Sequence, residues 1–446
     1  MNMIIAPSIV SGTIHVPSSK SHTMRAILLA SLARGESHVN SALPSPDTQA
    51  MIAACRAIGA SISVVETARG LDLAITGTGG QPCAAETVID AGNSGQVLRF
   101  VAAMAALGPH YAIFTGDASI RSLRPMQPLL DGLAQTGAFA VSSRGNGYAP
   151  VIVRGPARAG AVHIADGQDS QTVSALLMLA AFLDGTTSIS VDRAGETPWI
   201  GLTLHWLEKL GVPFTNKGFV QYTVTGPVVP EGFDYTVPAD WSSAAFPIGA
   251  ALVSNATITI ENMDFDDVQG DKAILGCLES MGARFLQDRA NKKLTVLPTK
   301  SLPANGLRGA TIDVNHIIDA VPVLAAIACH AKSSTTIKGA AIARHKESDR
   351  IAAIASELGK LGARIEERPD GMVVHPSCLH GTGLQGTDLH GGSTESHHDH
   401  RIAMAVAVAA LGASGPVTIR DTACVAKSFP GFTATMRGAG AKMEEA

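Results

Sequence analysis

The 446-residue sequence has few aromatic and few charged residues. Phe, Trp and Tyr make up 4% of the chain and charged residues 16%, against about 25% charged residues in an average protein. With Ala and Gly abundant, this composition favours closely packed helices of small residues around a large core. The net charge of −4 argues against a broadly basic surface and therefore against nucleic-acid binding.

The sequence also lacks long hydrophobic runs and paired cysteines. Its longest apolar stretch, near residues 402–413, is well short of the ~18–20 residues that span a bilayer. The N-terminus does not resemble a leader or transit peptide. The six cysteines are scattered without a C-x-x-C pair, which is typical of reduced thiols. We therefore expect a soluble, cytoplasmic protein without a membrane partner.

What the sequence does contain is a repeated unit. A Gly-Ala or Gly-Val pair ends an amphipathic helix six times, at intervals of about 75 residues, a period typical of repeat architectures. These pairs begin at Gly59, Gly137, Gly211, Gly282, Gly362 and Gly440. Between them lie helices that are apolar on nearly every side and must be buried. They are expected from Met24, Val97, Val173, Ser243, Ala320 and Arg401. Each repeat is predicted to alternate strands with one helix of each kind.

Six such repeats exceed what one hydrophobic core accommodates, because single cores stop growing near about 250–300 residues. The predicted fold is therefore α/β with two lobes of three repeats. We expect residues 1–17 and 238–446 to form one lobe and residues 18–237 the other.

Each apolar helix begins with a polar cluster, such as KSHTMR, GNSGQVLR or HHDHR. Helix N-termini carry about +0.5 charge and disfavour cations unless an anion binds there. Capping alone explains Ser and Asp at these places, but it does not explain Lys20, Arg25, Arg99 and Arg401. If the helices of each lobe run parallel, their starts point into the cleft between the lobes. The pattern favours an anion-binding site there.

The most highly charged stretch is Arg344–Arg350, which precedes the amphipathic pattern Ile351, Ile354, Leu358 and Leu361. A solvated capping turn is the simplest interpretation, but the recurrence of the unit favours a functional cluster. Asp319, at the start of an apolar helix, fits an ordinary N-cap worth ~1 kcal/mol. A catalytic role for Asp319 therefore needs independent support.

Two further motifs resemble known sites without matching them. Ser18–Ser21 resembles the end of a phosphate-binding P-loop but lacks its glycine frame. His397–His400 resembles a metal cluster, yet no further ligands stand at matching spacing. His400 and Arg401 at a helix start fit anion contact better. No metal and no cofactor are expected.

Taken together, the motifs resemble those of the EPSP synthases, or 3-phosphoshikimate 1-carboxyvinyltransferases, over nearly the whole chain. The resemblance is carried by PSSKSHTMRAILLASLARG, GNSGQVLR, GDASIRSLRPM, DSQTVSALLM, IIDAVPVLA, HKESDRIAAIASELGKLGARIE, HDHRIAMA and AKSFP.

The resemblance implies a two-lobed fold of six βαβαββ-like repeats with inward-pointing helices. It implies transfer of the enolpyruvyl group of phosphoenolpyruvate to the 5-hydroxyl of shikimate 3-phosphate, with release of phosphate and without a metal. This reaction belongs to the shikimate pathway, which leads to chorismate and the aromatic amino acids. A monomer with two small-molecule substrates is expected.

The resemblance also assigns site residues. Shikimate 3-phosphate is expected to contact Lys20, Ser21, Arg25, Ser170, Gln171, Asp319 and Lys346. Phosphoenolpyruvate is expected to contact Lys20, Asn93, Gly95, Arg124, Gln171, Arg350, Arg401 and Lys427, with His400 as a further candidate. For proton transfer, Asp319 is assigned as base and Glu347 as acid, with Lys20 or Lys346 nearby.

The chain departs from the family pattern at four positions. Gln96, Asp169, Glu196 and Ile342 stand where Thr, Ser, Ser and Asn are common, and an anion at Asp169 would repel a substrate phosphate. Two alternatives stay open. One is the sister transferase that acts on UDP-N-acetylglucosamine, although Ser119 stands where that family carries a reactive cysteine. The other is a non-catalytic anion-binding protein, although Asp319 and Glu347 would not help pure anion binding.

Overall fold

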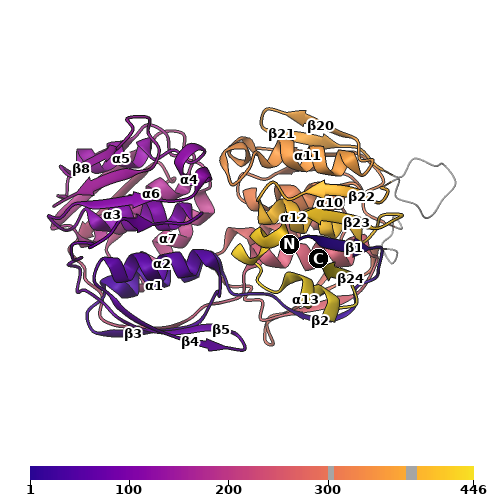
Figure 1. The fold of residues 1–446 in the computed structure, drawn as a ribbon, viewed down its shortest axis with the longest axis horizontal. Coiled ribbons are helices and arrows are strands. Elements are labelled where there is room, and N and C mark those ends of the chain that lie inside the picture. The colour runs from indigo at the N-terminus through magenta and orange to yellow at the C-terminus, as the bar shows by residue number, and fades with distance from the viewer. Residues whose placement is uncertain (300–305, 378–388) are drawn as a thin grey trace. The chain divides into compact units, whose positions relative to one another are not determined.

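The computed structural model describes residues 1–299, 306–377 and 389–446. The chain forms two compact units (Figure 1). The terminal unit consists of Met1–Pro17 and Ala239–Ala446, and the central unit of Ser18–Pro238. The chain therefore passes between the units twice, each time next to a proline. Both chain ends belong to the terminal unit, where β1 (Met3–Ala6) pairs with β24 (Lys442–Glu445).

Within the described residues, the strands form six four-stranded sheets that share one topology. In each sheet the two strands at one edge are parallel and the other two pairs are antiparallel, as in the order β10-β11-β13-β12. A buried helix connects the parallel strands of this sheet, and an amphipathic helix leads to the antiparallel pair. The prediction of six βαβαββ repeats, three in each unit, is confirmed.

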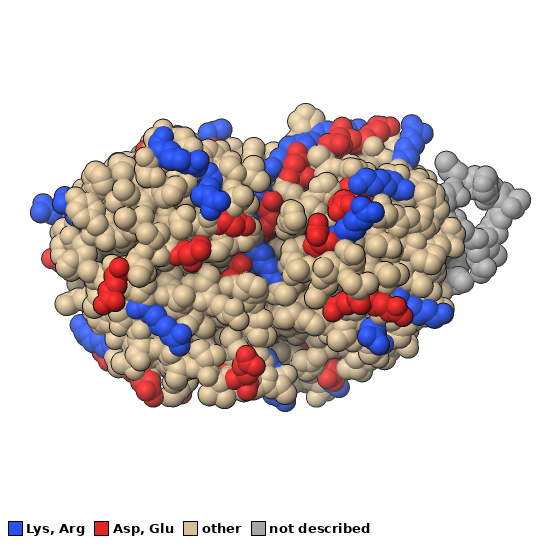
Figure 2. Space-filling model, in the orientation of Figure 1, with Lys and Arg blue, Asp and Glu red and all other residues tan. Residues whose placement is uncertain are grey.

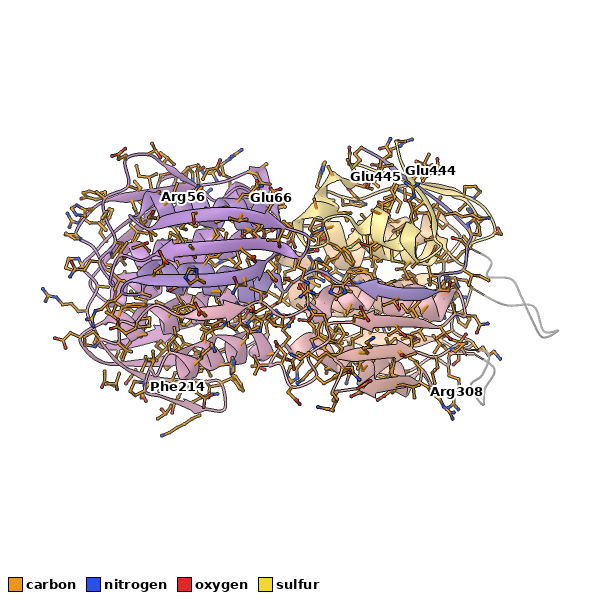
Figure 3. The ribbon with its side chains drawn as sticks, turned by 90° about the horizontal axis from the view of Figure 1, so that it is seen from below. Arg56, Glu66, Phe214, Arg308, Glu444 and Glu445 are labelled. Atoms are coloured by element: carbon orange, nitrogen blue, oxygen red, sulfur yellow. The ribbon has the colours of Figure 1, made fainter. Side chains whose placement is uncertain are left out.

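The central unit contains three sheets. Their strands are β3 (Glu36–Ala42), β4 (Ser61–Thr67), β5 (Gly70–Thr76), β6 (Ile89–Asp90), β7 (Ala112–Thr115), β8 (Phe139–Ser142), β9 (Val151–Arg154), β10 (Ala161–Ile164), β11 (Gly185–Val191), β12 (Phe214–Lys217), β13 (Gln221–Gly226) and β14 (Asp234–Thr236). Its helices are α1 (Lys20–Leu32), α2 (Pro46–Ala57), η1 (Val97–Val101), α3 (Ala102–Ala105), α4 (Ala118–Ser122), α5 (Gln127–Gln135), α6 (Ser170–Phe182) and α7 (Thr197–Lys209). Figure 3 looks onto the long strands of the sheet that contains Glu66, while Phe214 of β12 lies at the other edge of the same unit.

The terminal unit repeats this plan. Its further strands are β2 (Gly12–His15), β15 (Ile258–Glu261), β16 (Phe285–Asp288), β17 (Lys293–Val296), β18 (Thr311–Asp313), β19 (Thr335–Lys338), β20 (Ile365–Arg368), β21 (Gly371–Val374), β22 (Gly392–Glu395) and β23 (Val417–Arg420). Its helices are α8 (Trp241–Val253), η2 (Gly270–Ala273), α9 (Ile274–Ser280), η4 (Ile318–Ala320), α10 (Val321–Ala328), η5 (Ala341–His345), α11 (Arg350–Lys360), α12 (His400–Ala410), η6 (Thr422–Lys427) and α13 (Phe432–Gly438).

In each unit, one sheet is completed by a strand from a distant part of the chain. Strand β2 pairs in parallel with β15 of the terminal unit, whereas β14 pairs in parallel with β3 of the central unit. Each of these strands therefore belongs to a sheet whose other strands lie far away in the sequence.

The apolar helices form the core of each unit. In the terminal unit α8, α10 and α12 pack against one another, and in the central unit α6 packs against η1 and α3, while α1 contacts η1. All residues of α10 and α12 are buried. The predicted positions of these helices are confirmed, with two local differences. The second begins as the π-helical turn η1, and the fifth begins as the 3₁₀ turn η4.

The six repeat-closing glycines all adopt a positive φ, between +73° and +109°. A side chain is strained in this left-handed region because Cβ approaches the following carbonyl oxygen. The Gly-Ala and Gly-Val pairs therefore mark helix ends because the helix ends in a left-handed conformation that glycine adopts without strain. Their spacing corresponds to the structural repeat.

Uncharged residues cover most of the face seen in Figure 2, with acidic and basic side chains scattered among them. Among residues 1–299, 306–377 and 389–446, no helix is both long and apolar enough to cross a bilayer. Five cysteines, Cys55, Cys83, Cys277, Cys329 and Cys424, are free thiols. Cys378 lies outside the described residues.

Gly282 and Gly276 offer a matched test of the repeat-closing position. An added methyl group meets open space at both, but only Gly282 has a positive φ (+97°), whereas Gly276 lies inside α9. Gly282→Ala should lower the free energy of unfolding by about 1–2 kcal/mol. Gly276→Ala should raise it by up to about 1 kcal/mol, because alanine favours a helix interior. Urea unfolding would measure both changes, and equal stabilities would contradict the conformational explanation.

Candidate functional site

Arg350, the first residue of α11, is the centre of a charged cluster in the terminal unit. Its guanidinium is buried, with 2% of the side chain exposed. It donates from Nη1 to Asp319 Oδ1 at 2.6 Å, from Nη2 to Glu347 Oε2 at 2.6 Å and from Nε to Asp399 Oδ2 at 2.8 Å. One cation therefore holds three carboxylates that come from three different segments of the chain.

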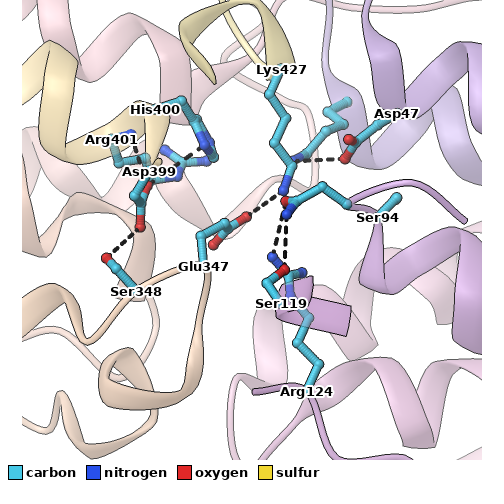
Figure 4. A network of polar contacts seen from close by, with 12 residues as sticks. Asp47, Ser94, Ser119, Arg124, Glu347, Ser348, Asp399, His400, Arg401 and Lys427 are labelled. Atoms are coloured by element: carbon cyan, nitrogen blue, oxygen red, sulfur yellow. Dashed lines mark hydrogen bonds and ion pairs between the residues drawn. The ribbon is translucent and has the colours of Figure 1, made fainter. Parts of the chain in front are cut away.

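Two further cations extend this cluster. Arg401 Nη2 lies 2.8 Å from Asp319 Oδ2 and also donates to Ser242 Oγ at 3.0 Å. Lys427 Nζ lies 2.9 Å from Glu347 Oε1, and Figure 4 shows these two side chains pointing toward each other. Because Ser242, Asp319 and Arg401 lie at the starts of α8, η4 and α12, the three core helices of this unit begin at one place.

Asp319 does not cap its helix, so the simplest sequence interpretation of this residue was wrong. Its two oxygens instead accept from Arg350 and Arg401. Burial raises the pKa of the Asp319 carboxyl, but Arg401 and Arg350 outweigh burial and hold that pKa well below its usual range. Lys346 lies close enough to act in the same direction. Asp319 is therefore ionised at neutral pH.

Residues of the histidine-rich stretch at the start of α12 belong to the same cluster. Asp399 is fully buried, accepts from Ser348 Oγ at 3.0 Å and caps α12 through the Arg401 backbone N–H. His400 is buried, with Nδ1 3.6 Å from Asp399 Oδ1. In the described part of the chain, no group of three or more His, Cys, Asp or Glu residues is arranged to hold a metal ion.

A second polar cluster lies in the central unit, around Gly95. A Cβ added to Gly95 would lie 2.9 Å from Arg99 Nη1, 2.9 Å from Gln171 Oε1 and 3.1 Å from Arg124 Nη1. Arg124 also donates to Asn93 Oδ1 at 3.3 Å. Glycine therefore lets two guanidinium groups and the Gln171 amide approach the backbone at Gly95 closely, where a side chain would collide with them.

Asp169 and Glu196, two of the four departures from the family pattern, each interact with a nearby residue. Asp169 caps α6 and lies 3.0 Å from Arg99 Nη2, which balances its charge. Glu196 is buried and its Oε2 accepts from the Ser170 hydroxyl at 3.1 Å. The structure therefore compensates the Asp169 charge and turns the Ser170 hydroxyl toward a carboxylate.

The remaining candidates of the central unit lie on α1. Lys20 Nζ is 3.5 Å from Asp47 Oδ2. Arg25 is buried and donates to Thr203 Oγ1, to the Trp199 carbonyl and to the Ser21 carbonyl. Burial lowers the pKa of Arg25 to about 9, so its charge is retained at neutral pH.

The structure thus gathers the predicted residues into groups within each unit. In the terminal unit Asp319, Lys346, Glu347, Arg350, Arg401 and Lys427 form one group, with His400 beside it. In the central unit Asn93, Gly95, Arg124 and Gln171 form a second group. Lys20, Arg25 and Ser170 have partners of their own, and the Ser21 carbonyl accepts from Arg25. Ile342 lies in η5, close to Lys346 in the sequence.

Sequence reasoning missed the counter-charges. Asp47 was not selected although it pairs with Lys20, and Asp271 was not selected although it is buried beside the Asp319 cluster. Asp47 stands in the first turn of α2, where an acidic residue is ordinary. No local pattern distinguishes such a residue from a helix-capping or surface carboxylate, because the partner lies elsewhere in the sequence.

Asp271 is a buried carboxyl whose charge is only partly compensated, by Arg401. It is 7% exposed, and its Oδ1 has no hydrogen-bond partner among the described residues. Burial and the nearby Asp319 and Asp240 carboxylates raise its pKa well above the usual range. The group is therefore stabilising only while it is protonated.

Replacing Asp271 by Asn should consequently stabilise the protein at neutral pH. With a folded-state pKa raised above the unfolded value of about 3.9, the wild type loses stability as the pH rises from about 4 toward the folded pKa. The amide does not titrate, so the advantage of Asp271→Asn in the free energy of unfolding should be larger at pH 7 than at pH 4. Urea unfolding at both pH values would measure it. A variant that is less stable than the wild type at pH 7 would contradict the assignment.

Comparison with known proteins agrees with this architecture. Residues 4–436 match the family model "EPSP synthase (3-phosphoshikimate 1-carboxyvinyltransferase)". The 3-phosphoshikimate 1-carboxyvinyltransferase of Chlamydia caviae is 40% identical over 443 residues, covering 99% of this chain and 94% of the relative. That of Ruminiclostridium cellulolyticum is 37% identical and both chains are fully covered.

Solved structures give the same result. EPSP synthase from Acinetobacter baumannii superposes with a TM-score of 0.81 at 28% identity, covering 100% of this chain and 99% of the other. The enolpyruvyl transferase NikO from Streptomyces tendae, at 18% identity and a TM-score of 0.80 over 100% and 98% of the chains, shares the fold. The resemblance inferred from the motifs is confirmed, and the chain belongs to the EPSP synthase (3-phosphoshikimate 1-carboxyvinyltransferase) family.

Proposed function

We propose that this protein transfers the enolpyruvyl group of phosphoenolpyruvate to the 5-hydroxyl of shikimate 3-phosphate and releases phosphate. Family membership over residues 4–436 supports the reaction. The observation on the chain itself that carries the proposal is the buried Arg350 cluster, in which cations alternate with carboxylates. Both substrates are phosphorylated, so fixed cations are needed to bind them, and proton transfer needs carboxylates beside those cations.

Phosphoenolpyruvate is proposed to engage both polar clusters. In the terminal unit its anionic groups would contact Arg350, Arg401 and Lys427, whose side chains are all at least nine-tenths buried. In the central unit the proposed contacts are Lys20, Asn93, Gly95, Arg124 and Gln171. Planar guanidinium groups suit this role because they can bind carboxylate or phosphate through two parallel hydrogen bonds.

Shikimate 3-phosphate is proposed to bind through Lys20, Ser21, Arg25, Ser170 and Gln171, with Asp319 and Lys346 at its ring hydroxyls. Lys20 would be shared between the two substrates. Asp169, the residue expected to repel a phosphate, already faces Arg99 at 3.0 Å. This ion pair with Arg99 reduces the repulsion that Asp169 would exert on the phosphate of the substrate.

The reaction requires two proton movements. In the proposed mechanism Asp319 accepts the proton of the 5-hydroxyl as its oxygen attacks C2 of phosphoenolpyruvate. Glu347, with Lys20 or Lys346 nearby, delivers a proton to the methylene carbon C3. The resulting tetrahedral intermediate then loses a proton from C3 while its C–O bond to phosphate breaks, so that the enol ether and phosphate are formed. The proton given to C3 thus returns to the enzyme, and the 5-hydroxyl proton held by Asp319 passes to the departing phosphate.

The low pKa of Asp319 is compatible with a role as base. The carboxylate is ionised before substrate arrives because Arg401 and Arg350 compensate its charge. When a substrate anion takes over part of that compensation, the proton affinity of Asp319 rises. In this proposal substrate binding itself makes Asp319 a stronger base.

One assay separates the candidate reactions. The protein is mixed with phosphoenolpyruvate and either shikimate 3-phosphate or UDP-N-acetylglucosamine, and phosphate release is followed. We expect release with shikimate 3-phosphate alone. Release with UDP-N-acetylglucosamine alone would assign the sister reaction, and release with neither would leave a binding protein.

Lys20→Ala and Arg124→Ala test the proposed contacts of the central unit. Each should lower kcat/KM by about a hundredfold or more, because each removes a fixed cation from the reacting anions. Lys217→Ala, an exposed lysine on β12 of the same unit, is the matched control and should leave kcat/KM unchanged. Circular dichroism would verify that all three variants fold. Near-normal activity of either cation variant would refute its assignment.

A further inference from the structure

Glu357 is a fully buried carboxylate that lies outside the Arg350 cluster. Its side chain is 0% exposed, although it stands in the charged and amphipathic helix α11. Its oxygens accept from His397 Nε2 at 2.7 Å and from the Glu395 backbone N–H at 2.8 Å. Lys360 Nζ lies 2.8 Å from both oxygens. A buried carboxylate is retained in a fold only when it is paired in this way.

These partners belong to the segment that leads into α12. Glu395 ends β22, and His397 lies two residues before Asp399, the cap of α12. Since an ionised carboxylate only accepts hydrogen bonds, His397 must donate from Nε2. Burial raises the pKa of Glu357, but the hydrogen bonds from Lys360, His397 and the Glu395 backbone outweigh burial and keep that pKa below its usual value.

The same segment has a strained backbone. His397 and His398 adopt φ values of +53° and +55°, in the left-handed region that non-glycine residues rarely occupy. Such a conformation persists only where the surrounding structure determines it. Ser396 contributes by accepting from the His398 backbone N–H and by donating to the Asp421 carbonyl. Glu357 contributes from the other side through His397.

Glu357 and Arg350 hold this segment at two points. They are seven residues apart in α11, which places them on one face of the helix and about 10 Å apart. Arg350 binds Asp399, and Glu357 binds His397 and Glu395. Ser396, through the Asp421 carbonyl, and Ser348, through Asp399, hold the same segment from other elements. The two contacts from α11 add to these and orient the segment from which Asp399 and Arg401 enter α12.

We propose that Glu357 is a positioning residue for the reaction: through His397 it fixes the left-handed segment that places Asp399 and Arg401 beside Asp319. This inference rests on the proposed function, because its effect is read from phosphate release. Glu357 itself touches no reacting group in this proposal. Its removal should displace Arg401 relative to Asp319, and a misplacement of about 1 Å can cost a hundredfold in rate.

The test compares Glu357→Gln with a matched pair on the same unit. Glutamine keeps the shape but cannot accept from all three donors, so kcat/KM should fall about tenfold to a hundredfold, with KM for phosphoenolpyruvate raised. Glu366→Gln alters a second Glu–His pair, in which His375 Nε2 lies 2.8 Å from Glu366 Oε1 on the exposed side of β20. This control should retain wild-type constants.

Substitutions of His397 keep the proposal testable even if Glu357→Gln does not fold. His397 is about one-third exposed, so its replacement should be tolerated by the core. His397→Gln retains a donor near the Nε2 position and should stay within about twofold of the wild type, whereas His397→Leu should lose activity about as much as Glu357→Gln does.

Kinetic constants are measured well below the melting temperature, where every variant is folded. A purely structural role would lower Tm and leave kcat and KM of the folded enzyme unchanged. Wild-type constants in a folded Glu357→Gln or in His397→Leu would therefore overturn the proposal. If the wild type itself released no phosphate from phosphoenolpyruvate and shikimate 3-phosphate, the proposed function would fail instead, which keeps the two failures distinct.

Discussion

A single buried guanidinium, that of Arg350, holds the terminal unit's charged cluster together. Removing a charge from water costs several kcal/mol, and the cost is recovered only with well-placed counter-charges. Arg350 has three of them, in Asp319, Glu347 and Asp399. The three carboxylates belong to η4, the loop before α11 and the start of α12. One cation therefore determines the relative positions of segments that are up to 80 residues apart.

The cluster is close to electrically balanced before any substrate binds. Successive partners in the cluster alternate between positive and negative charge, in the order Lys427, Glu347, Arg350, Asp319 and Arg401. A bound anion must therefore share cations with carboxylates that are already present. This arrangement gives preorganisation, because the cations do not need to reorganise when charge develops. If substrate binds as proposed, this arrangement also couples binding to the proton affinity of the carboxylates, and a cluster of cations alone would lack that property.

The fold could be predicted from the sequence because its signals are local. A glycine at a positive φ, a run of apolar residues and a β-branched strand each report conformation within a few residues, and their sixfold recurrence defined the architecture. The ion pairs could not be predicted in this way. Glu357 meets His397 forty residues later, and Lys20 meets Asp47 across two helices. Nothing near Glu357 distinguishes it from Glu366, an exposed glutamate on β20.

The repeats also show where one core helix starts differently from the others. Most core helices begin with a Ser or Asp side chain that accepts from a backbone N–H, and Asp169, Asp240 and Asp399 all do so. Asp319 stands at the corresponding place in the fifth repeat, yet its helix starts with a 3₁₀ turn and with Pro322 in the first α-helical turn. Proline needs no hydrogen bond from a cap because it has no N–H to satisfy. The carboxylate at position 319 is thereby released from capping and faces Arg350 and Arg401. Local rules fail at functional sites for such reasons, and among these helix starts the proposed base occupies the one whose carboxylate is not a cap.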